Sequence, residues 1–247
     1  PFPTPLPFLL MIILIFLVIG VIFSTTASFV FGVPWLMPIL GAAVPYPIFF
    51  LQVRRQQYKS AFWWMLLWGV LQSIAVIVAT ASAPQTAAKV ILRGQSYTTE
   101  MLYWIRTGEG MEGSLNLFLP DHLLHYGIFC ILCVVTISSM ALIFGTWMLN
   151  YMNFYVAELV KVSAKPCLAA ILGWYPWSIL RIIGFIATGV ALAALGLNLV
   201  TRIRGEVPKS PFPKTYMLIG IGFVIADIVV KAVLAPIWQK LLLSALG

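Results

Sequence analysis

Three ionisable side chains lie inside long apolar runs of this sequence, where a charge is costly. Asp227 and Lys231 are four residues apart in the run 216–237, and Arg181 lies in the preceding run. Charges in hydrocarbon are usually paired, turned toward the protein interior, or functional. If the two runs form antiparallel helices, the start of the first and the end of the second lie on the same side of the membrane. Arg181 and Lys231 then both lie about 7 Å from these ends, at 1.5 Å per residue. We therefore expect an Arg181–Asp227–Lys231 cluster, which is either a structural ion pair or a substrate or proton path.

The only two histidines of the chain, His122 and His125, form a second candidate site in the stretch L-P-D-H-L-L-H-Y. Pro120 and Asp121 are typical of a helix start, where the aspartate caps free amides. The spacing of three places both imidazoles on neighbouring positions of one helix face. Such a pair suits a structural cap and interface anchor, two metal ligands, or acid–base chemistry with Asp121. The nearby carboxylates that could complete a metal site are Glu109, Glu112 and Asp121.

Most recognisable catalytic patterns are missing. The chain has no G-x-S-x-G, no H-E-x-x-H and no Walker motif, so it is not expected to hydrolyse a nucleotide by itself. Cys130 and Cys133 form a C-x-x-C, but an apolar helix opposes the access and deprotonation that redox or zinc chemistry requires. We expect no cofactor and no bound metal.

The elements that position these residues are predicted to be membrane helices. Of the 247 residues, 62% are hydrophobic and 9% charged, and the mean hydropathy is +1.01. Soluble domains carry roughly 25% charged residues. With several apolar runs of about 20 residues, the composition predicts an all-α, polytopic transmembrane bundle in a single domain, residues 1–247.

Six spans are predicted, at residues 8–31, 34–53, 61–83, 122–149, 176–200 and 216–237, or seven if 150–174 contains a weakly marked one. The first lacks a basic n-region and a cleavage pattern, so we expect a retained helix rather than a signal peptide. Pro38, Pro45 and Pro47 predict a kinked or broken second span. The polar stretch 84–121 contains T-T-E-M-L-Y-W-I-R (98–106), which predicts an amphipathic helix lying on the membrane surface.

The net charge of +8 is spread over short loops, which favours membrane orientation and anionic lipid headgroups over nucleic acid. In a six-span layout the loop 54–59 shares its side with residues 161–165, and the loop 202–214 lies opposite. We expect the 54–59 side to be cytoplasmic. The expected location is a bacterial-type inner membrane, with the lipid bilayer and protein partners or a homo-oligomer as partners.

A proline-broken helix together with intramembrane charge is typical of substrate paths. We therefore expect a small permease-like protein, or the membrane-embedded subunit of a transport complex, rather than an enzyme. The alternatives are a membrane enzyme acting on a lipid through Asp121, His122 and His125, and a structural anchor. A transporter predicts a polar cavity that reaches Asp227. An enzyme predicts that the histidines and the acidic loop residues converge in a cleft at headgroup level, and an anchor predicts neither.

Overall fold

The computed structural model describes residues 6–207 and 211–247, and this part of the chain contains helices and no strands. The predicted all-α membrane bundle is confirmed. The elements are α1 (Leu6–Phe31), α2 (Leu36–Ala43), α3 (Tyr46–Arg54), α4 (Tyr58–Ser82), α5 (Pro84–Val90), α6 (Gly94–Thr107), η1 (Met111–Gly113), α7 (Leu115–Val135), α8 (Ser139–Val162), α9 (Pro166–Leu172), α10 (Pro176–Ile203) and α11 (Lys214–Leu246).

Five helices are long and apolar enough to cross a membrane, namely α1, α4, α7, α10 and α11. A sixth crossing results if α2 and α3 form one bent span. Their axes differ by 40° at a break that contains Pro45. A proline inside a helix removes an amide donor and clashes with the preceding turn, so the predicted break of the second span is confirmed.

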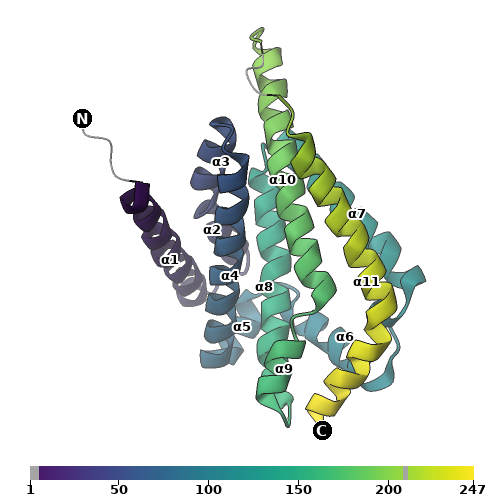
Figure 1. Cartoon of the computed structure of the whole chain (residues 1–247). Coiled ribbons are helices and arrows are strands. Elements are labelled where there is room, and N and C mark those ends of the chain that lie inside the picture. Colours follow the sequence, from purple (N-terminus) through teal and green to yellow (C-terminus); the bar gives the residue numbers. More distant parts are fainter. Residues whose placement is uncertain (1–5, 208–210) are drawn as a thin grey trace.

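The fourth predicted span, 122–149, is wrong in its bounds. The chain reverses direction at residues 136–138, and α8 then runs back through the middle of the bundle (Figure 1). Ile137 and Ser138 both have positive φ, and the Met140 amide donates to Thr136 Oγ1 at 3.0 Å, which caps the start of α8. The physical reason is this local polar cluster, which ends one helix and begins another inside an otherwise apolar run.

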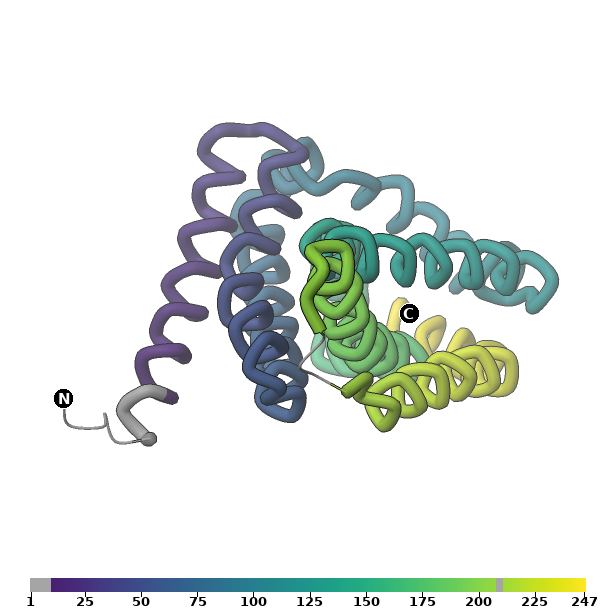
Figure 2. The backbone as a smooth tube through the Cα atoms, turned by 90° about the horizontal axis from the view of Figure 1, so that it is seen from above, coloured from purple at the N-terminus to yellow at the C-terminus, as the bar shows by residue number. Residues whose placement is uncertain are grey.

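The reversal also changes which loops share an end of the bundle. Residues 54–59 and the end of α10 lie at one end, whereas α5, α6 and α9 lie at the other (Figures 1 and 2). The six-span layout placed 54–59 with 161–165, and the additional long helix α8 makes that assignment wrong. We refer to the end formed by α5, α6, η1 and α9 as the α6 end.

The amphipathic helix predicted in the polar stretch is present as α6. Its apolar flank is formed by Met101, Trp104 and Ile105, which are all buried. These side chains belong to a cluster with residues of α8, α9 and α11, so the apolar flank packs against protein rather than lipid. The Gln239 side-chain amide also donates to the Ile105 carbonyl at 2.6 Å, which ties α6 to α11.

Candidate functional site

A polar cavity of about 260 Å³ lies at the α6 end, where α6, η1, α7, α8, α10 and α11 meet. Its walls combine both histidines of the chain with cationic, acidic and aromatic side chains. The residues that matter most are Arg93, Tyr97, Glu112, Asp121, His122, His125, Tyr151, Arg181 and Lys231. Residues from two separate predicted clusters therefore line one space.

A close crossing of α10 and α11 brings the first of these clusters together. A Cβ atom on Gly184 would lie 3.1 Å from the Gly220 carbonyl, and a Cβ atom on Gly220 would overlap Thr188 Oγ1. Small residues let helix backbones approach closely, which is a common way for membrane helices to associate. Arg181 precedes Gly184 by three residues and Asp227 follows Gly220 by seven, so both side chains lie beside this crossing.

Arg181 and Asp227 form the ion pair expected from their depth. Arg181 Nε donates to Asp227 Oδ2 at 3.0 Å and Nη2 donates to Oδ1 at 3.3 Å. The Asp227 side chain is fully buried and that of Arg181 is 17% exposed. A bidentate guanidinium–carboxylate pair is the geometry that best compensates a buried carboxylate.

His122 is a further partner of Asp227 that the sequence did not predict. Its Nε2 atom lies 2.8 Å from Asp227 Oδ2, although the carboxylate oxygen lies away from the ideal N–H direction. His122 is buried on α7 and also lines the cavity. Asp227 therefore links α7, α10 and α11, while the cavity wall itself is formed by its partners.

Lys231 does not pair with Asp227, which corrects the predicted three-residue cluster. Its Nζ contacts Glu112 Oε1 at 2.9 Å and lies 4.1 Å from the centre of the Phe118 ring. The physical reason is the turn η1, which places Glu112 over the middle of α11. The Lys231 side chain is only 3% exposed, so the ion pair and the cation–π contact together compensate a buried charge.

His125 is held in one orientation by Asp121. Its Nδ1 atom lies 2.8 Å from the Asp121 carbonyl oxygen and 3.2 Å from Oδ2, and its ring stacks on Phe144. Two oxygen acceptors at Nδ1 favour the tautomer with the proton there, which leaves Nε2 as a base in the neutral ring.

The predicted capping role of Asp121 is wrong, because α7 begins at Leu115 and both Pro120 and Asp121 lie inside it.

The aromatic wall of the cavity comes from α6 and α8. The Tyr97 and Tyr151 rings are 4.8 Å apart, and the Arg93 guanidinium lies 5.4 Å from the Tyr151 ring centre. Burial raises the pKa of Tyr97 well above its ordinary value, and the nearby Glu112 carboxylate adds to the effect. The Tyr97 hydroxyl therefore stays protonated and can donate to a ligand.

Within residues 6–207 and 211–247, no three His, Cys, Asp or Glu side chains are close enough to hold a metal ion. The acidic loop residues thus do not complete a site with His122 and His125. Each histidine instead has a carboxylate neighbour of its own, an arrangement that supports proton transfer.

The spans and the bundle define a multi-pass integral membrane protein. No family model, no curated protein and no solved structure matches this chain. Its function is therefore inferred from the site alone.

Six of the eight candidate residues named from the sequence line the cavity, Asp227 lies directly behind two of them, and Glu109 is not part of the lining. Sequence reasoning missed the contributions of Arg93, Tyr97 and Tyr151. The sequence indicated only that Arg93 and Tyr97 belong to the polar stretch 84–121 and that Tyr151 lies between the two asparagines of α8. Neither pattern indicates which face of a helix a side chain occupies.

Proposed function

We propose that this protein is an integral membrane enzyme that uses acid–base chemistry on the polar end of a lipid. One observation carries the proposal: His122 and His125, each beside a carboxylate, meet Glu112, Arg181 and Lys231 in one cavity. A purely structural membrane anchor does not require these groups to line one cavity.

His125 is the general base in this proposal. Its Nε2 atom takes a proton from water or from an acceptor hydroxyl, whose oxygen then attacks an ester at the lipid headgroup. The proton passes to the leaving alkoxide as the ester bond breaks, so the imidazole returns to its neutral form. Asp121 keeps the ring oriented and stabilises the imidazolium that forms between the two steps.

Arg181 and Lys231 stabilise the negative charge that develops on the ester oxygens. Fixed cations in a water-poor site act strongly on such charge because little reorganisation is needed. Arg181 is five residues after the start of α10, which places it about 7 Å along the helix from that end. A lipid headgroup can reach this depth from the membrane surface.

A transport function, as a permease or as a subunit of a transport complex, is the second candidate. It is favoured by the 40° break between α2 and α3 and by the Arg181–Asp227 pair, since broken helices and intramembrane charges accompany substrate paths. The burial of Asp227 behind its partners makes this candidate weaker, because a carboxylate in a transport path has to be reached by the substrate.

The enzyme proposal is tested with purified protein in nanodiscs made from a bacterial total lipid extract. We expect mass spectrometry to detect lipid products that accumulate with time for the wild type and for Lys240→Gln, a control at the α6 end outside the cavity. His125→Gln should lower the rate at least a hundredfold, in line with the loss of a general base. Identical lipid profiles for the wild type and His125→Gln would contradict the proposal and leave transport as the function to test.

A further inference from the structure

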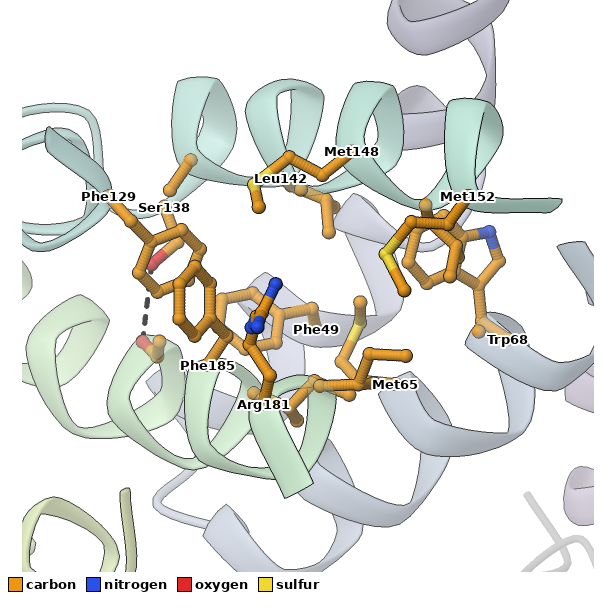
Figure 3. Close-up of a pocket in the computed structure, with 17 residues that line it drawn as sticks. Phe49, Met65, Trp68, Phe129, Ser138, Leu142, Met148, Met152, Arg181 and Phe185 are labelled. Atoms are coloured by element: carbon orange, nitrogen blue, oxygen red, sulfur yellow. Dashed lines mark hydrogen bonds between the residues drawn. The ribbon is translucent and has the colours of Figure 1, made fainter. Parts of the chain in front are cut away.

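A second cavity, of about 100 Å³, lies next to the polar one, and its walls are almost entirely apolar (Figure 3). It is lined by side chains of α3, α4, α7, α8 and α10. Four residues line both cavities: Met148, Met152, Arg181 and Phe185. The two spaces are therefore neighbours that share one wall.

The apolar cavity extends lengthwise along the bundle. Its lining on α8 runs from Ser138 to Met152, and its lining on α10 runs from Arg181 to Gly189. At 1.5 Å per residue these stretches are about 21 and 12 Å long. The lining therefore begins beside the polar site, at Met152 and Arg181, and continues toward the opposite end of the bundle.

The side chains of this cavity suit an alkyl chain chemically. Apolar cavities do not retain water well and take up apolar ligands, and one of about 150 Å³ in another protein binds benzene. At about 100 Å³, this cavity has room for a short alkyl chain. Met65, Met148 and Met152 contribute flexible thioethers, which adapt to ligands of variable shape. The rings of Phe129 and Phe185 lie 4.7 Å apart on the α7 side and are tilted by 37° to each other.

Arg181 occupies the junction of the two cavities. Its guanidinium extends from α10 into the space below Met148 (Figure 3). Asp227 accepts one N–H from Nε and one from Nη2, which leaves both N–H groups of Nη1 and the second N–H of Nη2 as further donors. The Arg181 guanidinium would therefore lie between the apolar tail and the polar head of a ligand that occupies both cavities.

We propose that the substrate is an amphiphile with a single short alkyl chain in the apolar cavity and its head in the polar cavity, with Arg181 at the linkage between them. This inference rests on the proposed function, since it names the class of lipid that the polar site would act on. It also assigns the apolar cavity, which the acid–base chemistry alone does not require.

Two glycines allow the apolar cavity to be filled without a clash. Gly69 and Gly145 both line it, and a Cβ atom on either would meet no other atom within 4 Å. Leucine is a better helix former than glycine, so neither substitution should weaken its helix. Gly222 is the matched control, because it also has open space at its Cβ position but lies on the exposed face of α11, outside both cavities.

The probe is a single-chain phospholipid with a short alkyl chain that carries a photoactivatable diazirine near its end. We expect crosslinks in the wild type and in Gly222→Leu to fall on cavity residues such as Met65, Trp68 and Met148. Labelling of these residues should drop at least tenfold in Gly69→Leu and in Gly145→Leu. Absence of cavity labelling in the wild type, or equal labelling in all four proteins, would overturn the proposal.

Lipid turnover measured on the same preparations separates this inference from the proposed function. Loss of cavity labelling in the leucine variants, together with no turnover by the wild type, supports the tail site and contradicts the enzyme proposal. Turnover that persists unchanged in both leucine variants supports the enzyme proposal and overturns the tail site.

Discussion

At the scale of single residues, the central feature is a set of buried charges that compensate one another. Asp227 faces Arg181 and His122, and Lys231 faces Glu112. With neutral histidines these ion pairs sum to zero charge. A change at any of the four charged members therefore leaves an uncompensated charge in a poorly hydrated region.

We expect Asp227→Ala to destabilise the protein, because it removes the counter-charge of Arg181. Breaking a buried ion pair from one side costs about 3–5 kcal/mol. Thermal unfolding in detergent should show a clear decrease in Tm for this variant. The double variant Arg181→Met, Asp227→Leu should recover most of the stability, since two apolar side chains replace the pair. Equal Tm values for the wild type and Asp227→Ala would show that the pair is not structural.

Glu112→Gln should loosen the turn that covers the polar cavity. The glutamine amide oxygen can still accept from Lys231 Nζ, but the counter-charge is lost, and hydrogen bonds to charged groups contribute about 1.5–3 kcal/mol. Hydrogen–deuterium exchange should increase at residues 108–114 and stay unchanged in α4. Unaltered exchange across the turn would mean that η1 is held by other contacts.

The sequence predicted the Arg181–Asp227 contact because helix depth alone determined it. It did not predict the partner of Lys231, because Glu112 lies in a separate loop and its position depends on how η1 folds over α11. The role of Asp121 was misjudged for a local reason. Pro120 suggested a helix start, whereas α7 begins one and a half turns earlier, after Ser114.

At the scale of elements, the α10–α11 crossing holds the site together. Gly184 and Gly220 allow the two backbones to approach closely enough for Arg181 to reach Asp227. From the sequence, Gly184 and Gly220 are only glycines within apolar runs. Such glycines do not indicate which two helices pack against each other. The α7–α8 turn was not predicted either. The mean hydropathy of the run is dominated by its apolar residues, so three polar ones do not mark a break: Thr136, Ser138 and Ser139.

Gly220→Leu should separate α10 from α11 and weaken both stability and activity. A side chain at this position would collide with Thr188, whose hydroxyl is also hydrogen-bonded to Tyr126 at 2.9 Å. Gly222→Leu, two residues away with open space at its Cβ position, should leave both properties near wild type. Comparing Tm and lipid turnover for the pair checks the prediction, which fails if the two variants behave alike.

At the scale of the whole molecule, the end opposite the site is rich in basic residues. The short loops there carry Arg54, Arg55, Lys59, Arg202, Arg204 and Lys214, with Glu206 as the only acidic residue in the same described segments. At the α6 end, basic residues alternate with acidic ones, and the Arg93–Glu100 and Lys161–Glu158 pairs are formed. Basic short loops favour the cytoplasmic side, so the site should face the outer leaflet.

Cys167 reports this orientation directly, because it is exposed on α9 at the α6 end while Cys133 is buried and Cys130 half-buried. A membrane-impermeant maleimide added to intact cells should label the wild type and fail to label Cys167→Ser. Labelling that requires permeabilised cells would place the site on the cytoplasmic side instead.

The two cavities should bind one lipid, on which His125 acts. Native mass spectrometry of the protein purified in mild detergent tests this most directly. We expect an amphiphile of defined mass to co-purify, to accumulate in His125→Gln because turnover is blocked, and to be lost in Gly145→Leu. A protein that carries no lipid, or the same lipid at the same occupancy in all three forms, would contradict the claim.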